Sequence, residues 1–151
     1  MDIEARAGTP APGIVVAAGV SAAPIDVETA WQAVETAETG AVVTFGGVVR
    51  NHDGGRGVER LAYSAHPSAP QRMLELAAEV ADRHPGTRLW AFHRIGDLVV
   101  GDSALVAAAA SAHRAEAFDA CRDLVEAVKH GVPVWKEQHF DDGDTEWVGI
   151  A

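Results

Sequence analysis

Residues 111–136 constrain what this chain can fold into more than any other stretch of its sequence. Apolar side chains recur there at the spacing of a helix that buries one face, and Gly131 and Pro133 then end that helix. Residues 134–140 alternate between two faces, which predicts a strand directly after the turn. The chain must therefore return from a packed helix to a sheet within a few residues. The buried face of the helix is expected to consist of Ala117, Phe118, Cys121, Leu124, Val125 and Val128.

The same stretch holds Lys129 and Lys136, which are the only two lysines in a chain of formal net charge −10. A helix end, a tight turn and a returning strand would bring the two side chains within reach of each other. Two ammonium groups near one site repel, which favours the neutral, reactive form of one of them. The spacing fits a pair of exposed lysines equally well, and Lys129 by itself lies where a helix dipole favours a cation.

The start of this helix is a second candidate site. If Ser111 caps the helix, His113 and Arg114 fall in its first turn, where backbone N–H groups lack partners and the dipole is positive. An arginine added to such N–H groups makes an anion-binding site. The alternative is an arginine on a solvated first turn, but the dipole disfavours a cation there, and we therefore favour the anion site.

The composition excludes several classes of function. With 22 acidic against 12 basic residues, the chain is not expected to bind nucleic acid or an anionic membrane surface. Cys121, the single cysteine, excludes an internal disulfide and is expected in the core rather than as a nucleophile. A single cysteine without an internal disulfide fits a cytoplasmic protein. The histidines show no ligand spacing, so neither a metal nor another cofactor is expected.

Taken in order, the chain predicts an α+β fold with a mixed or antiparallel sheet, because strands and helices interleave while hairpins are also present. We expect a flexible tail over residues 1–12, with no targeting segment, and a single domain over 13–151. Strands are expected at 14–19, 41–49, 58–65, 87–95, 103–110, 134–140 and 145–148, and helices at 27–38, 68–83 and from Ser111 to the turn at Gly131.

Local signals refine these boundaries. Asp26 is expected to cap the first helix and Gly40 to end it. Leu74 is placed on the inward stripe of the second helix, beside Met73, Ala77 and Val80. The glycine pair in strand 41–49 predicts a bulge, residues 50–57 a loop, and residues 96–102 a hairpin-like excursion of their own. Arg50 opens the glycine-rich loop, and by itself it is best interpreted as an ordinary loop arginine.

Four motifs in sequence order carry a family resemblance. They are Gly-Ala-Val-Val-Thr-Phe-Gly-Gly-Val-Val-Arg-Asn-His (40–52), His-Arg-Ile-Gly-Asp-Leu-x-x-Gly-Asp (93–102), Ser-Ala-His-Arg-x-x-Ala-Phe (111–118) and Lys-x-x-x-Pro-x-Trp-Lys (129–136). In these motifs the chain resembles the large, catalytic subunit of molybdopterin synthase, over nearly all of residues 14–148.

The resemblance implies an α/β-hammerhead fold with a small added antiparallel subdomain. It also implies a homodimer of large subunits, each binding a small ubiquitin-like sulfur-carrier subunit to form a heterotetramer. The carrier ends in a Gly-Gly thiocarboxylate, and the substrate is a cyclic pyranopterin monophosphate that receives two sulfurs to become molybdopterin. Both the tail and the phosphate are anions, which agrees with the cluster of cations.

By motif, the resemblance implies that Lys129 is the principal catalytic lysine and that Lys136 supports it. Arg50, His113 and Arg114 would bind the substrate, the latter pair from either protomer, and Phe45 would line the channel for the carrier tail. The chain departs from many relatives at Val48, His66 and Glu146, which leaves secondary substrate contacts open. A non-catalytic adaptor that binds a ubiquitin-like Gly-Gly tail is the alternative function. A phosphate-binding hydrolase is disfavoured because no activated Ser or Cys and no metal constellation is present.

Overall fold

The computed structural model describes residues 11–149. Residues 1–10 of the expected tail and the last two residues of the expected domain lie outside that range. The helices are α1 (Val27–Val34), α2 (Ala69–Arg83) and α3 (Arg114–Gly131). The strands are β1 (Ile14–Ser21), β2 (Ala41–Val48), β3 (His52–Asp53), β4 (Arg56–Ala65), β5 (Arg88–Arg94), β6 (Gly96–Val99), β7 (Ser103–Ser111), β8 (Val134–Phe140) and β9 (Thr145–Val148).

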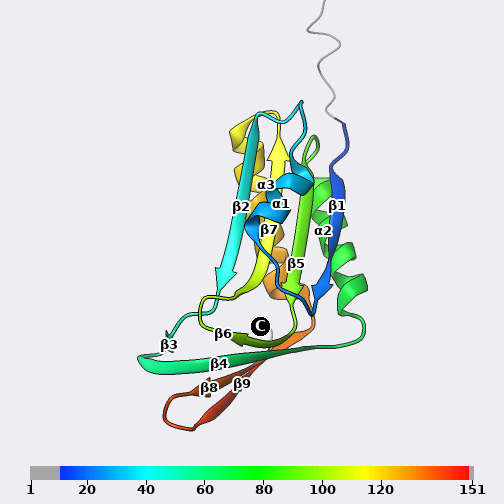
Figure 1. The fold of residues 1–151 in the computed structure, drawn as a ribbon. Helices are drawn as coiled ribbons and strands as arrows, with labels where there is room; N and C mark the ends of the chain where they lie inside the picture. The colour runs from blue at the N-terminus through cyan, green and yellow to red at the C-terminus, as the bar shows by residue number, and fades with distance from the viewer. Residues whose placement is uncertain (1–10, 150–151) are drawn as a thin grey trace, which may run out of the picture.

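The larger layer is a four-stranded mixed sheet with helices on both faces (Figure 1). Its strand order is β1-β5-β7-β2, in which β1 and β5 are parallel and the other neighbours antiparallel. Helices α2 and α3 pack on one face and α1 on the other. This arrangement confirms the predicted α+β class and the mixed sheet.

Strand β7 is the centre of this layer. Residues 104–111 are all buried, and five of them are the alanines at 104 and 107–110. Because helices cover both faces, a central strand must carry apolar side chains throughout rather than alternate with polar ones. The small side chains let α3 and α1 approach the sheet closely, and Ala107 and Ala109 face α3 while Ala108 and Ala110 face α1.

The second sheet is antiparallel and lies across the lower end of the first (Figure 1). Its long strand β4 pairs with β8 along one edge and with β3 and β6 along the other, and β9 extends the sheet beyond β8. A separate apolar cluster joins the two sheets, and this sheet is the small antiparallel subdomain that was expected. Its buried members are Val49, Val58, Leu61, Leu98, Ala104 and Phe140.

Every expected strand is present, and each end lies within two residues of its prediction. The Asp26 cap is also confirmed, since the backbone N–H of Thr29 donates to Asp26 Oδ1 over 2.7 Å. A cap of this kind stabilises a helix by about 1 kcal/mol. The expected bulge is present in β2, where the pairing with β7 shifts between Gly47 and Val48. None of the helices within residues 11–149 is long and apolar enough to cross a membrane.

Two helix boundaries were predicted wrongly. Helix α1 ends at Val34 rather than near Gly40, because the side chains of Thr36 and Thr39 bond to backbone groups and form a turn that competes with the helix. Ser111 does not cap α3, because it is the last residue of β7. His113 takes the N-cap position instead, without a side-chain hydrogen bond.

Two apolar side chains that were expected to be buried on the inner faces of their helices are exposed. Phe118 is 59% exposed and Leu74 is 44% exposed. Leu76 and Ala120 are buried in their place, so the buried faces of both helices are rotated from the prediction.

Two connectors are more regular than expected. Residues 50–57 contain the β3–β4 hairpin, whose turn is formed by Gly54 and Gly55 at φ of 58° and 79°. That backbone conformation favours glycine and suits a two-residue hairpin turn. Residues 96–102 do not form a hairpin of their own, because β6 pairs with the free edge of β4.

Candidate functional site

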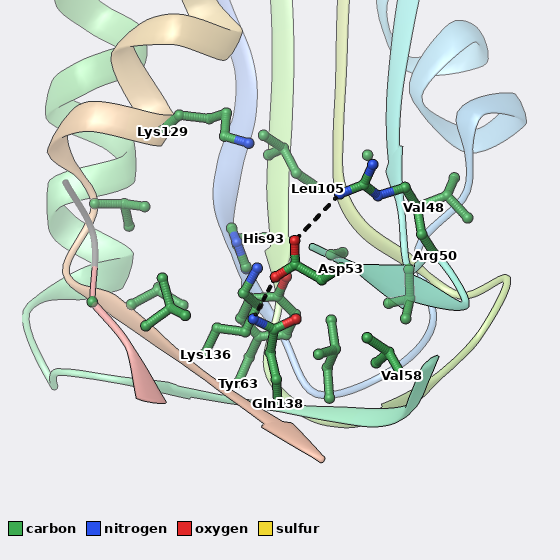
Figure 2. A pocket seen from close by; sticks show the side chains of 18 of the residues that line it. Val48, Arg50, Asp53, Val58, Tyr63, His93, Leu105, Lys129, Lys136 and Gln138 are labelled. Carbon is green, nitrogen blue, oxygen red and sulfur yellow. Dashed lines mark hydrogen bonds and ion pairs between the residues drawn. The ribbon is translucent and has the colours of Figure 1, made fainter. Parts of the chain in front are cut away.

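A cavity of about 720 Å³ lies between the two sheets, beneath the C-terminal end of α3 (Figure 2). Strands β4 and β8 form one side, and the lower ends of β2, β5 and β7 form the other. The polar and charged side chains that line it come from β3, β4, β5, α3 and β8 and from the loop after β2. They are Arg50, His52, Asp53, Tyr63, His93, Glu126, Lys129, His130, Lys136 and Gln138.

Lys129 and Lys136 both line this cavity. Lys129 lies in the last turn of α3, and Lys136 lies on β8 opposite Tyr63 of β4. Gly131 in the turn between them lets α3 pack closely on α2, because a Cβ there would come within 2.7 Å of Leu76 Cδ2. Close packing of α3 against α2 therefore directs the chain into β8 and places both ammonium groups at one opening.

Arg50 faces the same cavity from the loop after β2 (Figure 2). Its Nη2 lies 3.8 Å from Oδ1 of Asp53, and Nε2 of Gln138 donates to Oδ2 of Asp53 over 2.9 Å. The hydrogen bond from Gln138, and then the charges of Lys136 and Arg50, lower the pKa of Asp53 below its usual value. Asp53 is therefore an ionised carboxylate among the cations of the cavity.

His93 and Tyr63 form the inner wall. The two rings meet edge to face with centroids 4.9 Å apart. Nδ1 of His93 lies 2.7 Å from the carbonyl oxygen of Arg94, and because a carbonyl only accepts, Nδ1 carries the proton and Nε2 keeps its lone pair. Burial, and then the charge of Lys129, lower the pKa of His93 even though the bond to Arg94 opposes this. Burial raises the pKa of Tyr63.

His113 and Arg114 do not reach this cavity within one chain. They begin α3, whereas Lys129 is in its last turn. Fifteen residues of helix separate Arg114 from Lys129, which is about 22 Å at 1.5 Å per residue. Both side chains are exposed.

The other residues singled out from the sequence lie around the cavity or outside it. Phe45 lines it, and so does Val48, which is 51% exposed. Glu146 is exposed on β9 opposite Gln138, and His66 precedes α2, where its ring bonds to Ser68. Within residues 11–149, no group of three or more His, Cys, Asp or Glu side chains is arranged to hold a metal ion.

Sequence reasoning missed Asp53, Gln138, Tyr63 and His93 as cavity residues. Gln138 could have been found, because it lies two residues after Lys136 on the same face of a strand. His93 opens one of the quoted motifs. Nothing in the sequence placed Asp53, because its position depends on the β3–β4 hairpin.

The comparisons with known proteins agree with this fold. The family model described as MoaE protein matches residues 20–131. Molybdopterin synthase catalytic subunit 1 of Mycobacterium tuberculosis is 41% identical over 127 residues, covering 83% of this chain and 86% of that protein. The crystal structure of molybdopterin synthase from Staphylococcus aureus has a TM-score of 0.81 at 33% identity, covering 87% of this chain and 96% of that one.

A more distant structure shares the fold alone. It is the protein–protein complex of subunits 1 and 2 of molybdopterin-converting factor from Helicobacter pylori, with a TM-score of 0.64 and 19% identity, covering 87% of this chain and 88% of that one. The family match covers most of the chain, and the similarity to the M. tuberculosis relative covers most of both proteins. The chain therefore belongs to the MoaE protein family, whose relatives are catalytic subunits of molybdopterin synthase.

Proposed function

We propose that this chain is the sulfurtransferase subunit that converts a cyclic pyranopterin monophosphate to molybdopterin, using the C-terminal thiocarboxylate of a small ubiquitin-like carrier. One observation carries the proposal: the only two lysines of an acidic chain and Arg50 line one cavity. The thiocarboxylate and the phosphate are both anions, and three cations in a partly enclosed site suit them together. The catalytic-subunit name of the M. tuberculosis relative supports the same reaction.

In this mechanism the thiocarboxylate sulfur attacks an oxygen-bearing carbon of the pterin substrate, so that a C–S bond forms, the C–O bond at that carbon breaks and the departing oxygen takes up a proton. Water then cleaves the bond between that sulfur and the carrier carbonyl, which leaves sulfur on the pterin and a carboxylate on the carrier. Negative charge develops on the carbonyl oxygen during this cleavage. Lys129 stabilises that charge and exchanges protons with the reacting groups, and Lys136 supports it with a second positive charge.

The substrate is held by Arg50 together with His113 and Arg114. Because His113 and Arg114 of the same chain begin α3 about 22 Å from Lys129, we assign them to the cavity of a neighbouring protomer. The homodimer is thus part of the proposal, since the site is incomplete without the second copy.

The carrier is proposed as a separate small protein whose Gly-Gly tail enters beside Phe45, which lines the cavity at the end of β2. The H. pylori protein of similar fold was solved as a complex of two subunits, which supports a two-component assembly. Two carriers on one homodimer would form a heterotetramer.

The test is reconstitution with thiocarboxylated carrier and pterin phosphate, with the product identified by mass. We expect Lys129→Ala to lower the rate of dithiolene formation by at least about 100-fold, as for the loss of an acid–base or oxyanion group. The dissociation constant for the carrier should change little. Arg122→Ala is the matched control, because it removes an exposed cation of the same helix outside the cavity. A Lys129→Ala variant that forms product at the native rate would rule out the catalytic assignment and leave the adaptor function.

A further inference from the structure

One carboxylate of the cavity is held by the same cations that are proposed to bind anions. Asp53 lies 3.8 Å from Arg50 and accepts a hydrogen bond of 2.9 Å from Gln138. Lys136 is two residues before Gln138 on the same face of β8, and its charge also acts on Asp53. Glu126 is the other carboxylate that lines the cavity, but it lies beside His130 on α3.

The backbone fixes where this carboxylate lies. Asp53 pairs with Arg56 at the end of the β3–β4 hairpin, and the turn between them is formed by Gly54 and Gly55. Gln138 is 3% exposed, so its amide is held in place and directs Asp53 into the cavity. The carboxylate is thus presented by two paired strands rather than by an irregular loop.

The contact with Arg50 is, by contrast, easily exchanged. The side chains of Arg50 and Asp53 are 69% and 41% exposed, and the two charges are 3.8 Å apart. Solvent-exposed pairs of this kind contribute about 0–1 kcal/mol. A ligand carrying two negative charges would compete better for Arg50 than a ligand carrying one.

We propose that Asp53 is an internal competitor for the anion site: its carboxylate occupies the position between Arg50 and Lys136 that a phosphate group takes when it binds. Phosphate binding then requires Arg50 to exchange Asp53 for the ligand. Asp53 thereby lowers the affinity for every anion, and it does so least for those of higher charge. The identity of the phosphate as part of a pterin substrate rests on the proposed function, but the competition itself does not.

The test measures binding of inorganic phosphate to the carrier-free protein by NMR chemical-shift titration at constant ionic strength. Asp53→Asn removes the charge, while its amide oxygen can still accept the hydrogen bond from Gln138. We expect phosphate to bind about three- to tenfold more tightly to this variant, the effect of removing one nearby like charge. Asp53→Ser is a second neutral variant if Asp53→Asn folds poorly.

Two controls separate local competition from net charge. Asp82→Asn makes the same change of charge on the exposed end of α2, away from the cavity, and should change the affinity less than about twofold. In an Arg50→Ala background, Asp53→Asn should increase the affinity for phosphate much less than in the native chain, because the arginine for which Asp53 and phosphate compete is absent. The proposal is overturned if neutral variants at position 53 bind phosphate no more tightly than the native chain. It is also overturned if Asp82→Asn increases the affinity for phosphate as much as Asp53→Asn does, or if the increase caused by Asp53→Asn is the same without Arg50.

Turnover is measured separately on the reconstituted enzyme, so the two proposals can fail independently. If Asp53→Asn tightens phosphate binding but no variant of the chain forms dithiolene, the competitor stands and the sulfurtransferase function falls. If dithiolene forms and phosphate affinity does not respond to Asp53, the function stands and the competitor falls.

Discussion

The two ends of α3 carry cations in opposite surroundings. At the C-terminal end, Lys129 faces a cavity shared with Lys136 and Arg50, and its charge acts on the half-buried His93. At the N-terminal end, Arg114 is exposed, and no described residue forms an ion pair with it in residues 11–149. A helix dipole would favour anions at the N-terminal end and cations at the C-terminal end. The cavity proposed to bind anions nevertheless lies at the C-terminal end. Tertiary packing, and not the dipole, therefore decides where this chain can enclose a ligand.

The N-terminal end also exposes a large apolar side chain. Phe118 lies one turn after Arg114 and is 59% exposed, whereas Leu124 further along the helix is fully buried. A cation and an aromatic ring on one exposed surface suit contact with another protein more than solvent. This supports the proposal that the N-terminal end of α3 completes a cavity in a second protomer.

The largest expected effect tests that assignment directly. Lys129→Ala and Arg114→Ala are each expected to form little product, but dimers that contain one chain of each kind should regain one intact site. Random mixing makes half of the dimers mixed, so about one quarter of the native activity should return. The measurement is dithiolene formation by co-expressed variants with distinct affinity tags.

The matched control for this restoration is Lys129→Ala with Arg50→Ala. These two residues line the cavity of one chain, so mixed dimers should stay at the activity of their parents. If the Lys129→Ala and Arg114→Ala pair also shows no recovery although mixed dimers form, Arg114 does not act in the neighbouring cavity and the two ends of α3 are functionally unrelated.

Within the cavity, a smaller effect is expected at Lys136. Lys136→Ala should lower the rate of dithiolene formation by about tenfold, which is the loss of about 1.4 kcal/mol of transition-state stabilisation. Its effect should exceed that of Arg122→Ala and fall well below that of Lys129→Ala. A loss equal to that of Lys129→Ala would reverse the ranking and make the two lysines equal partners.

Much of the framework was predictable because it depends on local pattern. The apolar strands, the Asp26 cap and the Gly131–Pro133 turn are signals within a few residues of the feature that they specify, and each was found in place. The turn indicated that Lys129 and Lys136 could come within reach of each other, although the spacing fitted two exposed lysines equally well, and both residues line one cavity.

The remainder depends on contacts between distant segments. Phe118 belongs to the apolar spacing of α3, yet the packing of α3 against α2 and β7 rotates it outwards. Asp53 is placed in the cavity by the β3–β4 hairpin and by a hydrogen bond from Gln138, 85 positions later. The resemblance placed His113 and Arg114 at the same substrate as Lys129, but the length of α3 separates them within one chain. Sequence spacing carries no information on the placements of Phe118 and Asp53, whereas the length of α3 can be calculated from its residue numbers.

A smaller effect tests whether the Lys129 ammonium acts inside the cavity. Burial and the charge of Lys129 lower the pKa of His93, so Lys129→Ala should raise it toward its usual value of 6.5. NMR titration of the imidazole measures this change. Lys136→Ala is the control and should change the pKa of His93 less, because the charge of Lys129 is the one that lowers this pKa. An unchanged pKa in Lys129→Ala would place the ammonium outside the cavity.

The same shift makes stability depend on pH. Because the pKa of His93 is lower in the folded than in the unfolded chain, the unfolded chain takes up the proton first as the pH falls. The contribution of His93 to stability is therefore complete above pH 6.5 and is lost as the pH falls through the folded pKa. The free energy of unfolding of His93→Gln should show a shallower decrease than that of the native chain over this range. Equal slopes would contradict the shift.

The smallest effect is expected midway between the two ends of α3, at Cys121. Its side chain is 4% exposed and packs among α2, α3 and the sheet. Burial raises the pKa of the Cys121 thiol to about 11, so hardly any thiolate exists at neutral pH. The folded protein should react with iodoacetamide at pH 8 far more slowly than the unfolded chain. The Cys121→Ala variant should form dithiolene at a rate within about twofold of the native rate. Its free energy of unfolding should fall by about 1–2 kcal/mol because of the cavity left behind. Sulfur delivered by a partner requires no thiol in this helix. A loss of turnover in Cys121→Ala that exceeds its loss of folded protein would instead make the middle of α3 a participant in sulfur transfer.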